Sequence, residues 1–283
     1  MHKDQALQYL QRAMDLRIPQ ATSLSLFADY LESDAGKIFL GTMKKSERKS
    51  SAEIETLTSV YFNGVVEARK FRGFDGRAFP SFTFALATGV GKTRLMGAFV
   101  AYLFLVHDIR HFLLVAPGNT IYRKLMEDFS IMSNPKYVFR GIEEINGFTA
   151  NIITKDNYDR SPANTQSSLM GGNKIQINIF NIQQFAEKEK KGEDGELEGK
   201  GINAFSENHG KTYFEYLSGL DDLVVLLDES HHYHAEAAFG SLDRMKPLAG
   251  LEFTATPYTG NMIGRGKDRV QEEKQSIVYD YNL

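Results

Sequence analysis

The chain has 283 residues, with 33 Lys and Arg against 36 Asp and Glu, so its formal net charge is −3 and any nucleic-acid binding must come from a local patch. It contains no cysteine, which excludes a disulfide framework, a thiolate zinc site and a cysteine nucleophile. The apolar run from Phe99 to Val106 is far shorter than the roughly 20 residues that span a bilayer, and the N-terminus lacks a signal-peptide segment, so we expect a cytoplasmic protein with no membrane partner.

Residues 1–78 are predicted to form a helical region, which either packs against the rest of the chain or docks a partner. Leu7, Leu10 and Met14 recur at the spacing of one helix face, and Pro19 is expected to end that helix. A capping-box pattern at residues 50–53 predicts a second amphipathic helix, whose apolar face is marked by Ile54, Leu57, Tyr61, Val65 and Ala68. A basic cluster between the helices is either a solvated loop or a phosphate-contacting patch: Lys44, Lys45, Arg48 and Lys49.

After Gly76 the pattern changes to short apolar runs that alternate with helices. The runs predict strands at residues 82–87, 112–116, 175–180 and 223–227, and helices are predicted at residues 93–106 and 121–129. Such strands, separated by helices, indicate a parallel sheet that is covered on both faces, and therefore an α/β fold. Two polar, Gly-rich insertions at residues 156–173 and 188–203 are expected to be mobile surface loops.

The segment 87–93 has the sequence ATGVGKT and is expected to join a strand to a helix. Its glycines let the backbone curl so that consecutive N–H groups face a phosphate, and the helix N-terminus adds partial positive charge. Lys92 is suited to reach the β- and γ-phosphates of a nucleotide, and the Thr93 hydroxyl is suited to ligate Mg²⁺. Leu86 stands where the G-x-x-x-x-G-K-[ST] pattern has its first glycine, so the match is incomplete.

The second motif is acidic and follows the strand predicted at residues 223–227. Asp228 is placed to hold Mg²⁺ through water, and Glu229 is placed to orient and deprotonate an attacking water. The alternative is that the two carboxylates cap a helix. Three histidines follow, and they form a zinc site only if their rings converge; otherwise His231 lies beside the γ-phosphate and the other two face polar neighbours: His231, His232 and His234.

Together these segments resemble the motifs of superfamily 2 helicases and translocases. Asp228-Glu229-Ser230-His231 resembles the DExH box, and residues 87–93, 115–120 and 253–257 resemble motifs I, Ia and III. In motif I of these proteins the first glycine is often replaced, which accounts for Leu86. Five segments of the chain resemble the restriction (Res) subunit of type III restriction enzymes in their local sequence: ATGVGKT, PGNTIYRKL, NIFNIQQF, LLDESHHY and GLEFTATP. The resemblance covers about residues 79–260.

The resemblance implies a RecA-like P-loop NTPase domain at residues 79–283, with a mainly parallel sheet flanked by helices, after the helical extension at 1–78. It implies ATP and Mg²⁺ as cofactors, with nucleotide bound by Thr88, Gly89, Val90, Gly91, Lys92, Thr93 and Arg94. Coupling of nucleotide state to nucleic-acid grip is expected from His231, Thr254 and Thr256. Nucleic-acid contacts are expected from strand-end loops around Pro117, Asn119, Thr120, Arg123 and Lys124, and around Asn181, Ile182 and Gln183. For Arg123 and Lys124 an ordinary exposed helix face is the alternative.

The chain departs from the family pattern in two respects. No adenine-recognition motif is evident upstream of Phe82, and motifs IV to VI of a second RecA-like lobe, with its arginine finger, do not follow motif III. Arg265 and Arg269 are interpreted as linker or surface residues. We therefore expect the ATP-binding lobe of a DNA translocase, weak in turnover without a second lobe, acting on double-stranded DNA and depending on a methyltransferase partner for site specificity.

Two other classes of function stay open at this stage. One is a nucleic-acid or partner-binding module that retains the ATPase shell without turnover; DNA binding would then be independent of ATP. The other is a metal-dependent hydrolase built on His231, His232 and His234, which stoichiometric zinc would reveal.

Overall fold

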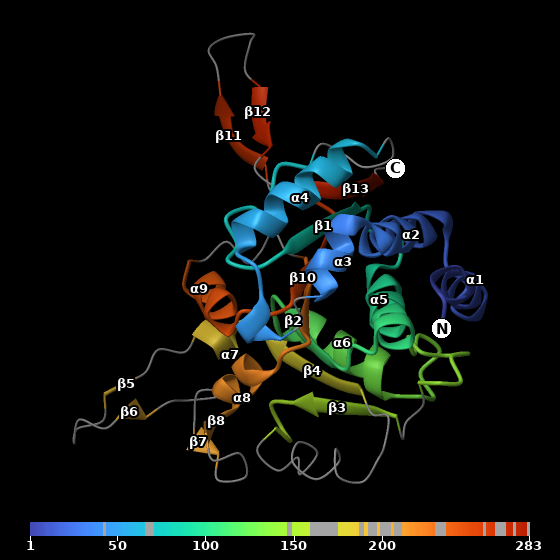
Figure 1. Ribbon diagram of the computed structural model, residues 1–283. Helices are drawn as coiled ribbons and strands as arrows, with labels where there is room; N and C mark the ends of the chain where they lie inside the picture. The colour runs from blue at the N-terminus through green and yellow to red at the C-terminus, as the bar shows by residue number, and fades with distance from the viewer. Residues whose placement is uncertain are drawn as a thin grey trace.

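A seven-stranded sheet is the centre of this computed structural model, and its strand order is β13-β1-β10-β9-β2-β4-β3 (Figure 1). Every pairing in this sheet is parallel, which confirms the predicted α/β class. The structure describes residues 1–41, 44–65, 71–145, 149–158, 175–186, 190–191, 197–198, 205–206, 211–229, 236–256, 259–263, 270–273 and 276–281.

The elements of the sheet and its flanking helices have the following bounds. The sheet strands are β1 Ser81–Leu86, β2 His111–Ala116, β3 Ala150–Thr154, β4 Ile175–Asn181, β9 Leu223–Asp228, β10 Ala249–Thr254 and β13 Ile277–Tyr281. The helices are α1 Lys3–Ala13, α2 Ile18–Glu32, α3 Asp34–Gly41, α4 Ser51–Asn63, α5 Lys92–His107, α6 Asn119–Ser130, α7 Gln183–Ala186, α8 Tyr213–Gly219 and α9 Glu236–Met245, with a 3₁₀ turn at Lys45–Glu47.

Side chains of successive strand residues point to opposite faces of the sheet, and helices cover both faces. In β2, Phe112 and Leu114 belong to the core under α1–α6, whereas Leu113 and Val115 belong to the core on the opposite face. The second core is completed by apolar side chains from the other helices, namely Phe185, Tyr213, Leu217, Leu242 and Met245. Burial on both faces explains why the strands have continuous apolar sequences.

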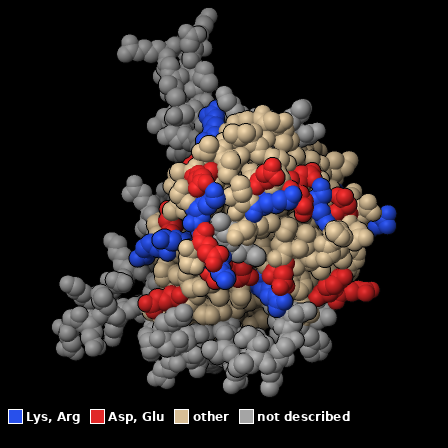
Figure 2. All heavy atoms as spheres, in the orientation of Figure 1, with Lys and Arg blue, Asp and Glu red and all other residues tan. Residues whose placement is uncertain are grey.

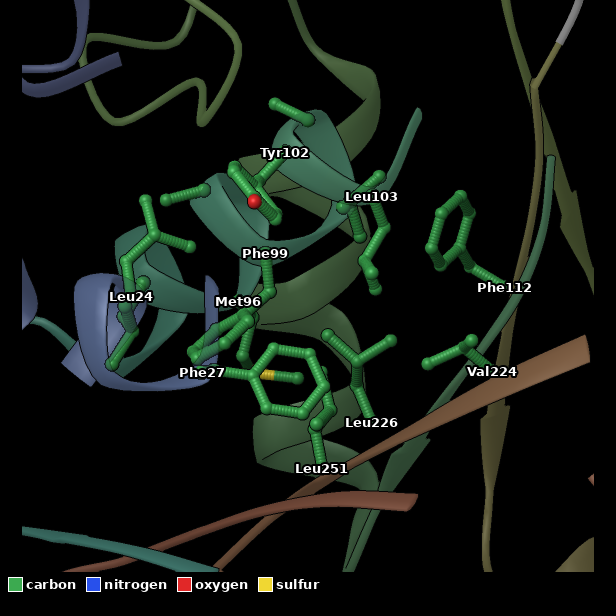
Figure 3. Packing of buried hydrophobic residues seen from close by; sticks show 14 of the residues in the cluster. Leu24, Phe27, Met96, Phe99, Tyr102, Leu103, Phe112, Val224, Leu226 and Leu251 are labelled. Carbon is green, nitrogen blue, oxygen red and sulfur yellow. The ribbon is translucent and has the colours of Figure 1, made fainter. Parts of the chain in front are cut away.

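Helix α5 lies between α2 and the sheet, as Figure 3 shows. Met96 and Phe99 are fully buried there, and the Phe99 ring lies 5.5 Å from that of Phe27 in α2. The helix approaches the segment after α6 so closely that a Cβ atom on Gly97 would lie 2.7 Å from the Val138 Cβ. The N-terminal helices therefore share one hydrophobic core with the sheet.

The N-terminal region differs from its sequence prediction in several places. Pro19 does not end a helix: α1 ends at Ala13, and Pro19 lies in the first turn of α2, where the missing N–H costs no intrahelical bond. Helix α4 begins as predicted, with the Ser50 hydroxyl accepting a hydrogen bond from the Glu53 amide. It ends at Asn63, so Val65 is not helical, and Ala68 lies outside the described residues.

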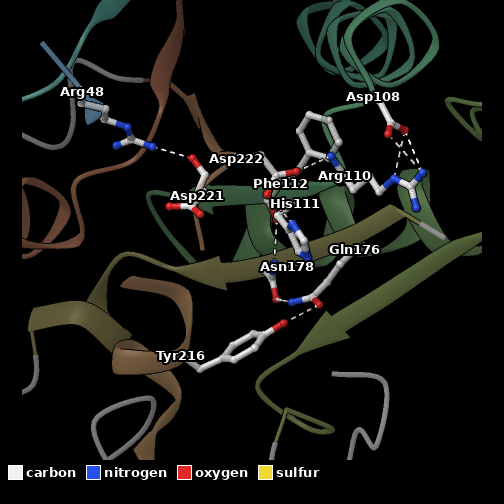
Figure 4. Close-up of polar contacts among 10 residues, drawn as sticks. All are labelled: Arg48, Asp108, Arg110, His111, Phe112, Gln176, Asn178, Tyr216, Asp221 and Asp222. Carbon is white, nitrogen blue, oxygen red and sulfur yellow. Dashed lines mark hydrogen bonds and ion pairs between the residues drawn. The ribbon is translucent and has the colours of Figure 1, made fainter. Parts of the chain in front are cut away.

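The basic cluster is neither a plain solvated loop nor a patch of free cations. The Lys45 Nζ donates to the carbonyls of Ser218 in α8 and Met245 in α9. The Arg48 guanidinium donates to the carbonyls of Asp221, Lys246 and Pro247 at the amino edge of the sheet. Figure 4 shows the contact with Asp221. Cations near the last carbonyls of a helix stabilise its C-terminus, so these side chains join the N-terminal region to α8 and α9.

Several other elements were not anticipated. Strands β3, β10 and β13 were not among the predicted strands, and β13 lies at the edge of the sheet beside β1. The predicted loop at 188–203 contains two short antiparallel strands, β5 Lys190–Lys191 and β6 Leu197–Glu198. Two further antiparallel pairs are β7 Phe205–Ser206 with β8 Lys211–Thr212, and β11 Thr259–Ile263 with β12 Val270–Glu273. Of the predicted loop at 156–173, only residues 156–158 are described.

Cationic and anionic side chains are mixed over the face drawn in Figure 2, in keeping with the small net charge. Among the helices of the described residues, none has the length and apolar character needed to cross a bilayer.

Candidate functional site

The loop between β1 and α5 has the backbone that a phosphate loop requires. Gly89 and Gly91 have φ angles of +81° and +96°, a conformation that side chains with a Cβ rarely adopt. Gly91 caps α5, and Lys92 and Thr93 form the first turn of the helix, whose amides face its N-terminal end. The hydroxyl-bearing Thr93 is buried, while Thr88 and Gly89 are exposed. The predicted strand–loop–helix order is confirmed.

The register of the sheet brings the acidic motif and the loop to one edge. Strand β10 lies between β1 and β9, with Ala85 opposite Thr254 and Phe253 opposite Asp228. Since parallel strands end at the same edge, the phosphate loop, Thr254 and Asp228 follow three neighbouring strands. Thr254 is fully buried, and its hydroxyl donates to the Thr256 carbonyl at 3.0 Å.

An ion pair joins the two motifs. The Lys92 Nζ lies 3.0 Å from the Glu229 Oε1, and both side chains are largely shielded from water. Glu229 has a φ of +51°, a backbone conformation that is unusual for a non-glycine residue and is enriched at functional sites. Next to it, burial and the neighbouring Glu229 charge raise the pKa of Asp228 to about 6, against the opposing effect of Lys92 and Lys124.

These residues surround a pocket of about 410 Å³, within the range of ligand sites. Its lining comprises Thr88, Gly89, Gly91, Lys92, Thr93, Arg94, Ile121, Lys124, Asp128, Lys136, Asp228 and Glu229. Of the predicted nucleotide-binding residues, only Val90 lies elsewhere, in an adjoining pocket. Lys124 was considered as a nucleic-acid contact, yet it lines this pocket, because α6 packs beside α5.

A second pocket, of about 550 Å³, adjoins the first and shares Thr88 and Gly89 with it. Its other lining residues come from the start of α2, from the loop and from the end of β13: Arg17, Ile18, Pro19, Val90 and Tyr281. Ile18 is 81% exposed, which leaves an apolar surface next to the phosphate loop. A flat apolar ligand group fits such a wall.

The start of α2 also holds the phosphate loop in place, a role that sequence analysis missed. The Arg17 Nη1 donates to the Gly89 carbonyl at 3.0 Å, and the Gln20 Nε2 donates to the Gly91 carbonyl at 2.8 Å. Gln20 is 1% exposed, although its chain position is far from the loop. The available signal was Pro19, which marks the first turn of a helix as readily as the end of one.

The predicted nucleic-acid residues gather at the same edge of the sheet. The Asn181 Nδ2 donates to the Asn119 Oδ1 at 3.1 Å, and the Ile182 amide donates to the Ala116 carbonyl. The loops after β2 and β4 are thus side by side. Around this junction Pro117 is half-buried, and the exposed predicted residues are Asn119, Thr120, Arg123, Lys124 and Gln183.

Several predicted residues lie outside the described part of the chain. They are His231, His232 and His234 with Ser230, Pro257 in motif III, and Arg265 and Arg269. Among the described residues, no group of three or more His, Asp or Glu side chains is arranged to hold a metal ion. The zinc hypothesis therefore stays a hypothesis.

Comparison with known proteins gives a match to one family model. The model described as type III restriction enzyme, res subunit, matches residues 29–259. No curated protein sequence gives a match. Among solved structures, the chain is similar to the Sulfolobus solfataricus SWI2/SNF2 ATPase core in complex with dsDNA, with 10% sequence identity and a TM-score of 0.32. That match covers 74% of this chain and 32% of the other, so this chain spans about a third of that protein's length.

Proposed function

From the premise that this chain belongs to the type III restriction enzyme res subunit family, we propose that it is the ATP-binding lobe of a DNA translocase. The observation that carries the proposal is the Lys92–Glu229 ion pair beside Thr93 and Asp228 in one pocket. In this proposal residues 79–283 are the RecA-like unit, residues 1–78 are its helical extension, and a second lobe supplies an arginine to the γ-phosphate.

The ion pair suggests how nucleotide binding prepares Glu229 to act as the general base. Lys92 exchanges Glu229 for the β- and γ-phosphates, which offer it more negative charge. The Glu229 carboxylate is thereby released to orient the attacking water and accept its proton. Phosphoryl transfer depends mainly on positioning and on neutralising charge, and the loop amides and Lys92 supply both.

Thr93 and Asp228 are suited to hold Mg²⁺. Both residues line the same pocket, and hard cations of this size prefer oxygen ligands such as carboxylate and hydroxyl groups. Burial raises the pKa of Asp228 to about 6, and a nearby divalent cation offsets that cost of ionisation. When bound, Mg²⁺ neutralises phosphate charge.

We place the base of the nucleotide in the pocket formed by Arg17, Ile18, Pro19 and Tyr281. The pocket adjoins the phosphate loop, and Tyr281 offers an aromatic ring beside the exposed Ile18. Binding of the nucleobase would then influence the conformation of the phosphate loop, because Arg17 and Gln20 donate hydrogen bonds to that loop.

Double-stranded DNA is proposed to bind across the edge around Asn119 and Asn181. Pro117, Thr120, Arg123 and Gln183 surround this junction, and amide and hydroxyl groups contact phosphates without discriminating between bases. Thr254 and Thr256, with His231, are proposed to couple the nucleotide to this edge. Site specificity then comes from a methyltransferase partner in a type III restriction-modification system.

Two substitutions test the proposed function. Lys92→Ala should lower ATP affinity at least about tenfold, because it removes a charged hydrogen bond to phosphate. Glu229→Gln should preserve ATP affinity and lower turnover about 10²-fold or more, because it removes the general base. Calorimetric titration with ATP and an ATPase assay with and without duplex DNA measure both effects.

Unchanged ATP affinity in Lys92→Ala would contradict the phosphate-loop assignment. If Glu229→Gln altered no activity and DNA binding ignored ATP, the chain would instead be a binding module with an inactive ATPase shell.

A further inference from the structure

Helix α6 contributes charged side chains to the pocket of about 410 Å³ that Lys92, Asp228 and Glu229 line, here called the phosphate pocket. Ile121, Lys124 and Asp128 all line it, and their spacing of three and four residues puts them on one face of the helix. Lys136, in the segment after α6, lines the pocket as well. Arg123 is exposed on a different face of α6 and is not part of the lining. The adjacent side chains of Arg123 and Lys124 therefore lie on different surfaces of the molecule.

The electrostatics of the pocket agree with this geometry. Burial raises the pKa of Asp128, and Lys124 and Lys136 oppose the rise because their ammonium groups are close to it. Asp228, at the end of β9, lines the same pocket. Lys124 and Lys136 therefore add positive charge to the pocket that Lys92 also lines.

The order of the two pockets indicates which part of a nucleotide reaches Lys124. The pockets share Thr88 and Gly89, so a ligand whose base lies beside Tyr281 extends its phosphates past the loop toward Asp228 and Glu229. Lys124 and Lys136 lie on this phosphate side only. The terminal phosphate is the part of the ligand that is farthest from the base.

We propose that Lys124, assisted by Lys136, binds the terminal phosphate of the nucleotide and makes this lobe distinguish a triphosphate from a diphosphate. The proposal rests on the proposed function, since it assumes a nucleotide in the pocket. Asp128 adds a buried carboxylate to the lining on the same face of α6, where its Oδ1 accepts a hydrogen bond from the Asn134 Nδ2 at 3.3 Å. Arg123 stays available for the nucleic-acid edge.

The test compares Lys124→Ala with Arg123→Ala in the full chain. Both side chains are exposed, so neither substitution opens the core. Calorimetric titration with Mg·AMP-PNP and with Mg·ADP should show that Lys124→Ala weakens binding of the triphosphate about 10- to 100-fold, the range of a charged hydrogen bond, and leaves the diphosphate within about twofold. Arg123→Ala should leave both affinities unchanged, and Lys124→Arg should restore most of the triphosphate affinity.

Three outcomes would overturn the inference. The first is an unchanged triphosphate affinity in the double variant Lys124→Ala/Lys136→Ala. The second is an equal loss for both nucleotides, and the third is a loss of duplex DNA binding with nucleotide affinity intact. Lys92→Ala separates the two proposals: if it weakens both nucleotides while the α6 variants change nothing, the inference fails and the proposed function stands.

Discussion

At the scale of single residues, charged side chains from outside the two motifs line the phosphate pocket as well. They are Lys124, Asp128 and Lys136. Lys92 pairs with Glu229 at 3.0 Å, and Asp228 is almost completely buried beside them. A buried carboxylate is costly to ionise, and the cost is accepted here because the site is suited to receive a cation and phosphates. In the absence of a bound cation, ionised Asp228 therefore lowers the stability of the fold.

That trade predicts a pH-dependent stability. The pKa of Asp228 is raised to about 6 in the native state, so the native chain binds its proton more strongly than the unfolded chain does. The resulting stabilisation is complete below about pH 4 and is lost as the pH rises through about 6. Asp228→Asn should therefore be about 3 kcal/mol more stable than the parent at pH 7.5 and about equal to it at pH 4.

Urea unfolding followed by far-UV circular dichroism, without nucleotide or metal, measures this difference. Asp156→Asn is the control, because that side chain is exposed. A stability difference between Asp228→Asn and the parent that does not change with pH would contradict the assignment of the titration to Asp228.

At the scale of elements, a buried ion pair positions the loop that precedes β1. The Arg77 guanidinium donates to the Glu252 carboxylate in β10 at 2.7 Å, and the Ser81 hydroxyl donates to the same oxygen at 2.9 Å. The side chains of Arg77 and Glu252 are 8% and 4% exposed. Because β10 is central in the sheet, this contact fixes the start of the strand that leads to the phosphate loop.

We predict that Arg77→Met destabilises the chain by about 3–5 kcal/mol, because it leaves the Glu252 carboxylate buried without its cation. The double variant Arg77→Met/Glu252→Gln should recover at least half of the loss, since the glutamine keeps the Ser81 contact without a charge. Chemical denaturation of the two single variants and the double variant completes the cycle. A double variant whose loss equals the sum of the single losses would show that the pair is not coupled.

At the scale of the whole molecule, the N-terminal helices and the sheet are not independent. Leu10, Met14 and Phe27 belong to the same hydrophobic cluster as Phe99 and Phe112. Arg17 and Gln20 also bind the carbonyls of the phosphate loop. The helical extension therefore covers α5 and supports the loop between β1 and α5.

We expect the full chain to unfold in one cooperative transition. Deletion of residues 1–41 should expose the apolar surface of α5 and give a chain that binds a hydrophobic dye and lacks ordered tyrosine packing. Differential scanning calorimetry and near-UV circular dichroism are suitable, since the chain has 13 Tyr and no Trp. Two separate thermal transitions, or a deleted chain with native tyrosine signals, would establish the helical region as an independent unit.

Local pattern was sufficient for four strands of the parallel sheet (β1, β2, β4 and β9), for α5 and α6, and for placing the glycine loop and the acidic motif at strand ends. An apolar run that is buried on both faces, or a glycine loop before a helix, is recognisable from a few neighbouring residues. The same reasoning misjudged Pro19 and left the role of Lys45 and Arg48 undecided between two alternatives, because several outcomes share one local pattern.

Tertiary packing decided the rest. Gln20 supports Gly91, and Tyr281 lies beside the phosphate loop, because α2 and β13 pack there. Lys124 faces the phosphate pocket while Arg123 faces outward, and this depends on how α6 packs against distant elements. An exposed cation on an amphipathic helix has the same local sequence signal whichever surface it faces. The physical reason is that hydrophobic periodicity specifies which face of a helix is buried, whereas the neighbours of its polar face are set by the chain as a whole.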